Sequence, residues 1–132
     1  MKSFILKSIV LIFAVSIQTS CVDDDGNDCY YEIVSLATEV TGPTTSAVNV
    51  PIVFNVKFLP FDGCTTFLRF NQERIDNVFY LDVISKGEQC GCNQEIVEGT
   101  ATYSFTPTTP GTYTFRFTSD VDAVIIRNVT VQ

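Results

Sequence analysis

The 132-residue chain contains no histidine and no tryptophan, and it has a single methionine. Without histidine it cannot form a Ser-His-Asp or Cys-His catalytic arrangement, nor a metal site with imidazole ligands. Without tryptophan it lacks the largest aromatic platform for a sugar ring. Acidic residues remain, but their spacing supports no catalytic carboxylate pair. We therefore expect no enzyme activity, no catalytic residue, no metal and no cofactor.

No segment shows the 3.6-residue periodicity of an amphipathic helix, and turn residues recur at short intervals. Phenylalanine, threonine and valine are frequent, which is typical of strands. Residues 52–58 give the clearest pattern, because apolar residues occupy every second position there. The predicted strands cover residues 30–40, 52–58, 64–70, 78–84, 100–105, 112–117 and 123–132, with a turn or edge segment at 43–47 and a loop at 71–74.

The first twenty residues have the three parts of a secretory signal peptide. Lys2 and Lys7 supply the positive n-region, and residues 9–15 form an apolar run too short for a bilayer core of about 30 Å. Small and polar residues follow, up to Ser20. A transmembrane anchor is the alternative, and the short apolar run argues against it.

Cys21 comes directly after this predicted cleavage zone. Ser20 and Cys21 resemble the lipobox of bacterial lipoproteins, in which the cysteine becomes the first mature residue and carries the lipid. Thr19 and Gln18 depart from the strict motif, which prefers a small residue and an aliphatic one, but looser boxes are common among lipoproteins of Bacteroidota. The resemblance predicts acylation at Cys21, with palmitate among the chains.

Three aspartates follow the cysteine: Asp23, Asp24 and Asp25. The run is similar to the signal that exports Bacteroidota lipoproteins, and the resemblance predicts an anchor in the outer membrane with the protein facing the cell exterior. A run of like charges also stays solvated and forms a spacer. Clustered oxygens could instead bind calcium, but Asp28 and Val34 stand where an EF-hand loop needs glycine and glutamate.

The chain expected after cleavage is strongly acidic. Residues 1–20 contain two lysines and no acidic residue, so six basic residues face fifteen acidic ones and the net charge is −9. Such a surface repels nucleic acid and anionic lipid. We expect no nucleic-acid partner. About 110 residues suffice for one domain with a single core.

If Cys21 carries lipid, an even number of cysteines remains in an exported chain, which predicts disulfides with three possible connectivities. These cysteines are Cys29, Cys64, Cys90 and Cys92. A bridge between Cys90 and Cys92 would be strained, since residues two apart lie near the upper limit of Cα separation. We favour a bridge from Cys64 to one of that pair and from Cys29 to the other. A zinc site and a redox-active pair are alternatives, which oxidising surroundings and the lack of a basic neighbour disfavour.

Residues 105–117 contain two strands with an aromatic residue at every second position, joined by a corner at Pro110 and Gly111, with Tyr113 just beyond it. This arrangement resembles the E–F corner of immunoglobulin-like β-sandwiches, in which Tyr113 would hydrogen-bond to nearby backbone. The resemblance implies an immunoglobulin-like antiparallel β-sandwich of about seven strands. The chain departs from antibody-type domains, because the core tryptophan is missing and the cysteines do not have the B–F spacing.

Taken whole, the chain is similar to small single-domain immunoglobulin-like lipoproteins of Bacteroidota. We expect a lipoprotein signal peptide at residues 1–20, a lipidated cysteine and acidic tether at 21–29, and the β-sandwich domain at 30–132. The resemblance indicates a fold and a location, and no chemistry.

Two functions stay open. The first is a non-catalytic, lipid-anchored surface module that binds an outer-membrane or extracellular protein, or mediates adhesion. The second is a glycan-binding accessory of a polysaccharide-uptake system. Exposed aromatics grouped with Asn, Gln and Asp would favour sugar, whereas a flat apolar patch or an open strand edge would favour protein. The aromatic candidates, at strand ends or outer faces by alternation, are Tyr30, Tyr31, Phe67, Phe79 and Tyr80.

Overall fold

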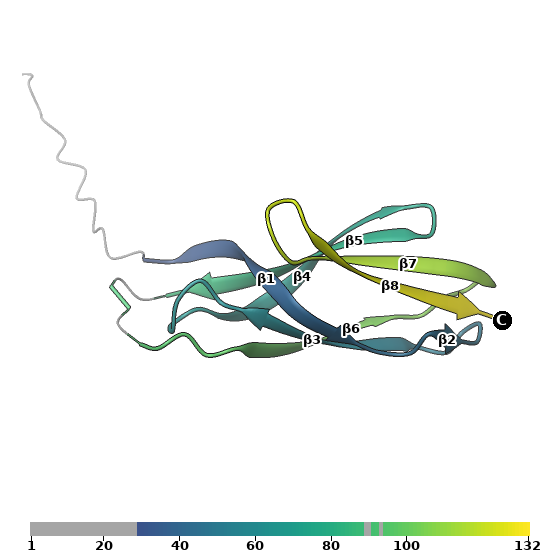
Figure 1. Ribbon diagram of the computed structural model, residues 1–132, viewed down its shortest axis with the longest axis horizontal. Helices are drawn as coiled ribbons and strands as arrows, with labels where there is room; N and C mark the ends of the chain where they lie inside the picture. Colours follow the sequence, from purple (N-terminus) through teal and green to yellow (C-terminus); the bar gives the residue numbers. More distant parts are fainter. Residues whose placement is uncertain (1–28, 89–90, 93) are drawn as a thin grey trace, which may run out of the picture.

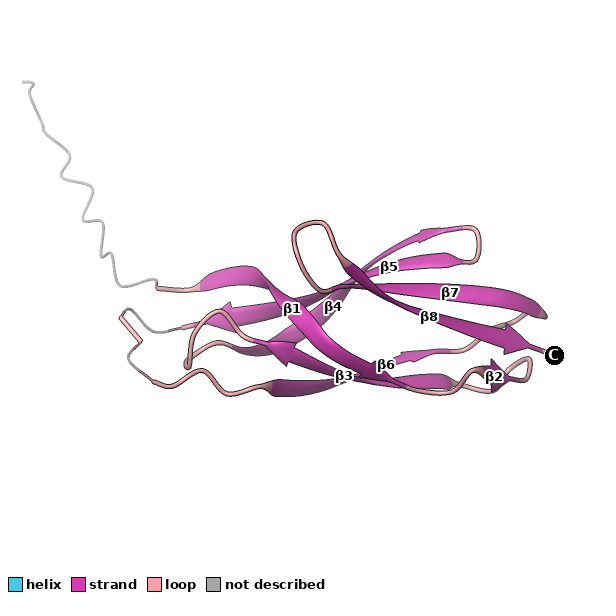
Figure 2. Ribbon diagram, in the orientation of Figure 1, coloured by secondary structure: helices cyan, strands magenta, loops and turns pink. Residues whose placement is uncertain are grey.

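The computed structural model describes residues 29–88, 91–92 and 94–132. Within these residues, all regular secondary structure consists of β-strands (Figure 2). The signal peptide, Cys21, the acidic run and Cys90 lie outside the described residues. The strands are β1 (Tyr31–Thr41), β2 (Thr45–Ser46), β3 (Ile52–Leu59), β4 (Thr66–Ile75), β5 (Val78–Gly87), β6 (Gly99–Phe105), β7 (Gly111–Thr118) and β8 (Val124–Val131).

The strands form two packed layers, which confirms the predicted all-β sandwich (Figure 1). Sheet A contains β2, β8, β7, β5 and β4 together with the first half of β1, and sheet B contains the second half of β1 with β3 and β6. Most neighbours are antiparallel. The pairs β5–β7 and β2–β8 are parallel, so sheet A is mixed rather than purely antiparallel.

Strand β1 belongs to both sheets. Its residues 31–35 pair with β5 in sheet A, and residues 36–41 pair with β3 in sheet B, with a register shift between Ala37 and Glu39. Figure 1 shows the strand running diagonally from one layer to the other. At the crossing point, the buried Ser35 hydroxyl donates to the buried Ser85 hydroxyl at 2.7 Å. This bond satisfies two polar groups that would otherwise be costly to bury.

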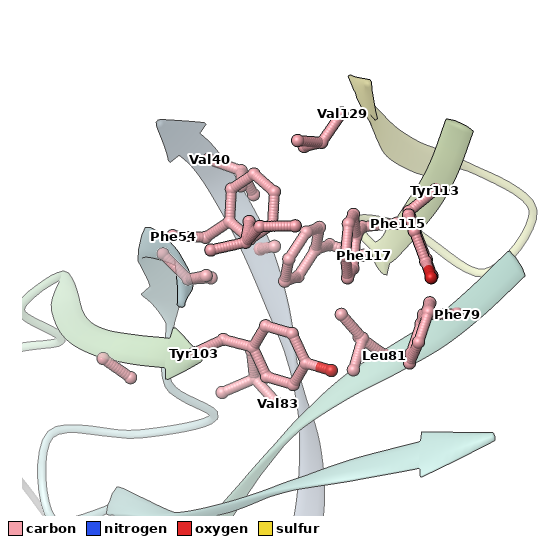
Figure 3. Packing of buried hydrophobic residues seen from close by; sticks show 14 of the residues in the cluster. Val40, Phe54, Phe79, Leu81, Val83, Tyr103, Tyr113, Phe115, Phe117 and Val129 are labelled. Carbon is pink, nitrogen blue, oxygen red and sulfur yellow. The ribbon is translucent and has the colours of Figure 1, made fainter. Parts of the chain in front are cut away.

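The core lies between the layers and is rich in aromatic rings (Figure 3). In β3 the apolar residues predicted to share one face are all buried, while the alternate residues are exposed. Phe54 of β3 lies 4.9 Å from the ring of Phe115 in β7, and Phe115 stacks on Phe79 of β5 at the same distance. These contacts join sheet B to sheet A through the centre of the molecule.

Tyr113 makes the hydrogen bond of a tyrosine corner. Its ring is buried in the core beside Phe79, and its hydroxyl donates to the carbonyl of Thr109 at 2.9 Å. Pro110 and Gly111 lie between the two partners, and Gly111 has a φ of 143°, a backbone conformation that favours glycine. The corner therefore fixes how the chain enters β7.

Arg127 of β8 forms hydrogen bonds that link the two sheets. Its side chain points toward β1, and its Nε and one terminal nitrogen donate to the carbonyl oxygen of Val40 at 2.8 and 2.5 Å. A charged donor makes a stronger bond than a neutral one. The guanidinium therefore connects β8 of sheet A to the part of β1 that lies in sheet B.

The structure corrects the sequence-based boundaries in one place. Residues 71–74 were predicted as a loop, but they lie within β4 and pair with β5. An exposed edge strand needs no alternation of apolar residues, because backbone hydrogen bonds to one neighbour hold it. The hairpin turns at Asp76 and Asn77, and Asp76 has a φ of 55°, which aspartate tolerates better than most residues. The described residues form eight strands, close to the expected number of about seven, and the additional short strand, β2, lies in the edge segment at 43–47.

We predict that Tyr113→Phe destabilises the domain by about 1 kcal/mol, because it removes the hydrogen bond to the Thr109 carbonyl and the contact with the Thr109 hydroxyl but keeps the buried ring. Urea unfolding at neutral pH measures the free energy of unfolding. Tyr80→Phe is the matched control, since Tyr80 lies on the exposed face of sheet A. Equal effects of the two substitutions would contradict a special role for the corner.

Candidate functional site

The longest open edge of the sandwich is β4. It pairs with β5 along one side, and no other strand among the described residues pairs with it. Eight of its ten residues are exposed. The pairing with β5 is regular over residues 69–75, so the free side offers an even row of backbone donors and acceptors. Strand β6 ends sheet B in the same way, but it is shorter.

Side chains on the inner face of β4 hold this strand against β6. Phe70 meets the ring of Tyr103 edge to face at 5.4 Å, and the Tyr103 hydroxyl donates to Gln72 Oε1 at 2.5 Å. Burial raises the pKa of Tyr103 to about 12, so its hydroxyl stays a donor at any physiological pH. Arg74 lies over the rings of Phe79 and Phe105, at 5.0 and 5.7 Å from their centroids. The edge is therefore fixed in place before any partner arrives.

The open edge also carries features that limit indiscriminate pairing. A register shift lies between Phe67 and Arg69, and charged side chains at Arg69, Glu73 and Arg74 follow it. Bulges and charges are the usual means by which edge strands avoid aggregation. Arg69 is paired with Glu32 of β1 at 2.6 Å. On the outer face beside the regular stretch, Glu73 is therefore the charged side chain that an added strand would meet, between Asn71 and Ile75.

The structure separates the aromatic residues that were candidates for sugar stacking. Phe79 was expected at an outer face or strand end, but it is fully buried in the core, because the even positions of β5 face outward and the odd ones inward. Tyr31 is only partly exposed and hydrogen-bonded to Asp62. Tyr30 and Tyr80 are exposed near opposite ends of sheet A, and Phe67 packs on Phe58 and Phe70. Among these five candidates, the two most exposed rings, Tyr30 and Tyr80, therefore share no common platform.

Tyr80 has polar neighbours on the outer face of sheet A. The guanidinium of Arg116 lies 5.6 Å from the Tyr80 ring centroid, and Glu73 is the cross-strand neighbour of Tyr80 on β4. Next to this row, Asp82 accepts from the Thr118 hydroxyl at 2.6 Å. The buried Nε of Arg116 has no hydrogen-bond partner among the described residues. A single exposed ring offers a sugar little surface on which to stack.

The predicted bridge between Cys64 and one cysteine of the Cys-Gly-Cys segment is confirmed. Cys64 is bonded to Cys92, with the two Cα atoms 5.8 Å apart. Cys29 is disulfide-bonded as well. Its predicted pairing with the other cysteine of the segment involves Cys90 and stays a prediction. The Cys64–Cys92 disulfide joins residues 28 positions apart. In the chain-entropy model, closing a loop of that length stabilises the fold by about 3 kcal/mol.

A hydrogen-bonded carboxylate lies beside this disulfide. Asp62 Oδ1 accepts from the Cys64 N–H at 2.9 Å and the Thr65 hydroxyl at 2.6 Å, and Oδ2 accepts from the Tyr31 hydroxyl at 2.5 Å. A Cβ at Gly87 would overlap the Tyr31 ring, so that position needs glycine. The hydroxyls of Thr65 and Tyr31 hold the pKa of the Asp62 carboxyl below its usual value. The carboxylate has a structural role, since it joins the loop after β3 to the start of β1.

We predict that Asp62→Asn lowers stability at neutral pH and that the difference from the unmodified protein shrinks in acid. The pKa of Asp62 is lower in the folded state than in the unfolded chain. Its stabilising effect is therefore complete above the unfolded value of about 4 and is lost as the pH falls through the folded value. Urea unfolding of both proteins between neutral and acidic pH tests this. Glu73→Gln on β4 is the control, and a difference for Asp62→Asn that did not change with pH would contradict the prediction.

Two of the other described carboxylates, Glu39 and Glu98, lie against Lys57 and a neighbouring hydroxyl. Glu98 accepts from Thr38 at 2.7 Å, and Glu39 pairs with Lys57 at 2.7 Å. Within residues 29–88, 91–92 and 94–132, no group of three or more acidic or cysteine residues could hold a metal ion. The same residues include no helix that could cross a lipid bilayer.

Comparison with known proteins indicates a family. The model of the ORF11 beta-sandwich domain matches residues 54–130, from the third residue of β3 into β8, which is more than half of the chain. Strands β1 and β2 precede the matched range. No curated protein and no solved structure matches the chain. The chain therefore belongs to the ORF11 beta-sandwich domain family.

Proposed function

We propose that this protein is a non-catalytic, lipid-anchored module that binds a protein partner at the cell surface through the free edge of β4. The open edge carries this proposal: ten residues, eight of them exposed, paired on one side only among the described strands. An extended segment of another chain adds to such an edge through backbone hydrogen bonds. The regular stretch at residues 69–75 would take about seven residues of a partner strand.

Side chains of β4 would select the partner. Asn71, Glu73 and Ile75 alternate with the inward Phe70, Gln72 and Arg74, so they line the outer face beside the free edge. An added strand would place its outward side chains next to theirs, where opposite charges stabilise and like charges repel. A lysine or arginine of the partner strand opposite Glu73 would complement the charge of this outer face. The acidic chain as a whole also favours a basic partner.

The location rests on the sequence. Ser20 and Cys21 resemble a lipobox, and Asp23, Asp24 and Asp25 resemble the export signal of Bacteroidota surface lipoproteins. An acylated Cys21 would hold the protein in the outer membrane, since several buried acyl chains bind a membrane almost irreversibly. The partner would then be a neighbouring outer-membrane protein or a protein of another cell.

A glycan-binding role has less support. Sugar-binding sites group exposed aromatics with amides and carboxylates, whereas Tyr30 and Tyr80 lie near opposite ends of sheet A and Phe79 is buried. Phe67 packs on other rings. Binding of polysaccharide to the domain, lost on Tyr80→Ala, would favour the glycan role over the protein role.

The anchor is tested by Cys21→Ala. We predict that the unmodified protein fractionates with membranes and that Cys21→Ala releases it, because the thiol is the only proposed attachment point. Immunoblots of membrane and released fractions measure the distribution. Val22→Ala, which keeps the cysteine, is the matched control. Retention of Cys21→Ala in the membrane would contradict the lipoprotein assignment.

The interaction edge is tested by site-specific photo-cross-linking in intact cells. A photoreactive residue at Asn71, on β4, is expected to give a discrete cross-linked species. The same residue at Asn55 should not, because Asn55 is exposed on β3, which has strands on both sides. The Asn71 product should disappear with Glu73→Lys, which reverses the charge beside the edge. Equal cross-linking from both positions would argue against β4 as the binding edge.

A further inference from the structure

One end of the sandwich exposes apolar side chains at its loop tips. Phe61, in the loop after β3, is 63% exposed, and Val97 and Ile96, in the segment before β6, are 70% and 46% exposed. Leu59, at the end of β3, is also exposed. Large exposed apolar groups that gather at one place mark a surface that contacts something else.

The two tips form one surface because their loops pack together. A Cβ at Gly63 would overlap the backbone of Gln94 and Glu95, so the two loops are in direct contact. The Cys64–Cys92 disulfide joins the same two segments. The apolar tips are therefore held next to each other.

This end is also where the chain enters the domain. The ring of Phe61 lies 6.3 Å from that of Tyr31, the first residue of β1. In Figure 1 the start of β1 and these loops lie at the end opposite the C-terminus. Cys29 follows Cys21 by eight positions, so a lipid on Cys21 would lie within about 29 Å of Cys29 even along a fully extended chain. The tips thus lie at the end of the described domain where the chain enters it.

We infer that these tips, Phe61, Ile96 and Val97, contact the lipid bilayer that holds the Cys21 anchor. Apolar side chains at loop ends can enter the boundary between headgroups and acyl chains, and a covalent lipid next to them removes most of the entropic cost of approach. Glu95 and Glu98 flank the tip before β6, so zwitterionic lipid suits this surface better than anionic lipid. The inference rests on the lipidation proposed above.

Membrane contact at this end would set the orientation of the domain. Strand β4 begins near the disulfide at Thr66 and runs toward the other end of the molecule. With the tips on the bilayer, β4 would point away from the membrane, and its free edge would face sideways. A neighbouring protein could then reach the edge.

The absence of tryptophan allows a direct test, because a single introduced tryptophan is the only such fluorophore in the chain. Phe61→Trp places it at the proposed contact. Val50→Trp is the matched control: Val50 is 48% exposed and lies before β3, at the opposite end of the strand from Phe61. The lipidated full chains, verified by mass spectrometry, are inserted in phosphatidylcholine vesicles with and without brominated acyl chains, which quench tryptophan on contact.

We predict that bromine lowers the fluorescence of Phe61→Trp about twofold and leaves Val50→Trp unchanged, since a tip in the interface lies within about 10 Å of the acyl chains. Thermal unfolding should be the same for both variants, because both sites are exposed. No quenching at either site on lipidated protein would overturn the membrane contact and leave the anchor intact. Quenching at both sites would overturn it too, since the domain would lie on its side. A chain that mass spectrometry finds without lipid would overturn both the contact and the anchor.

Discussion

The fold depends on one strand that takes part in both sheets. Residues 31–35 of β1 complete sheet A beside β5, and residues 36–41 form an edge of sheet B beside β3. Two sheets that share a strand cannot slide past each other without breaking hydrogen bonds in both. The buried bond between Ser35 and Ser85 lies at the crossover, and Arg127 reaches across to Val40 beyond it. The aromatic core between the sheets forms within that frame.

The same architecture leaves some strand edges without neighbours. Strand β4 is an edge strand of sheet A and β6 is an edge strand of sheet B, and no described strand pairs with the outer edge of either. Contacts between Phe70, Gln72 and Tyr103 close the space between these two strands, so the core is sealed while the backbone edge stays open. The side chains of β4 cover the core, whereas its backbone N–H and C=O groups form the open edge. One strand can therefore do both. This compatibility lets β4 be a stable element while its outer edge stays available for the strand addition proposed above.

Several described polar residues have structural roles: Asp62 holds a loop, Cys64 and Cys92 form a bridge, and Glu39 pairs with Lys57. What distinguishes the surface is where its open edge and apolar tips lie relative to the point at which the chain enters the domain. The apolar tips at the end where the chain enters the domain and the free edge along its length are the two features on which the proposed membrane-displayed, protein-binding module rests.

Local patterns in the sequence were sufficient for the all-β class, for most strands and for the corner tyrosine. Alternation along residues 52–58 depends only on the period of a strand, and the contact of Tyr113 with Thr109 spans four residues. Local patterns carry no information on pairing between distant segments, and this explains the two predictions that were wrong. Residues 71–74 are polar, and only pairing with β5 makes them a strand, while the burial of Phe79 depends on which face of β5 meets the core. The Asp76-Asn77 pair was a usable hairpin signal for this region.

By itself, the sequence determined the strand composition, the acidic charge and the pairing of Cys64 with the Cys-Gly-Cys segment. Only the tertiary structure decided that β1 joins two sheets, that β5 and β7 run parallel, that β4 is left open, and that Phe61 and Val97 share one end of the domain. These properties arise from pairings between segments far apart in the chain. No local pattern encodes them, because a strand's own residues specify its faces but not which neighbour takes each edge.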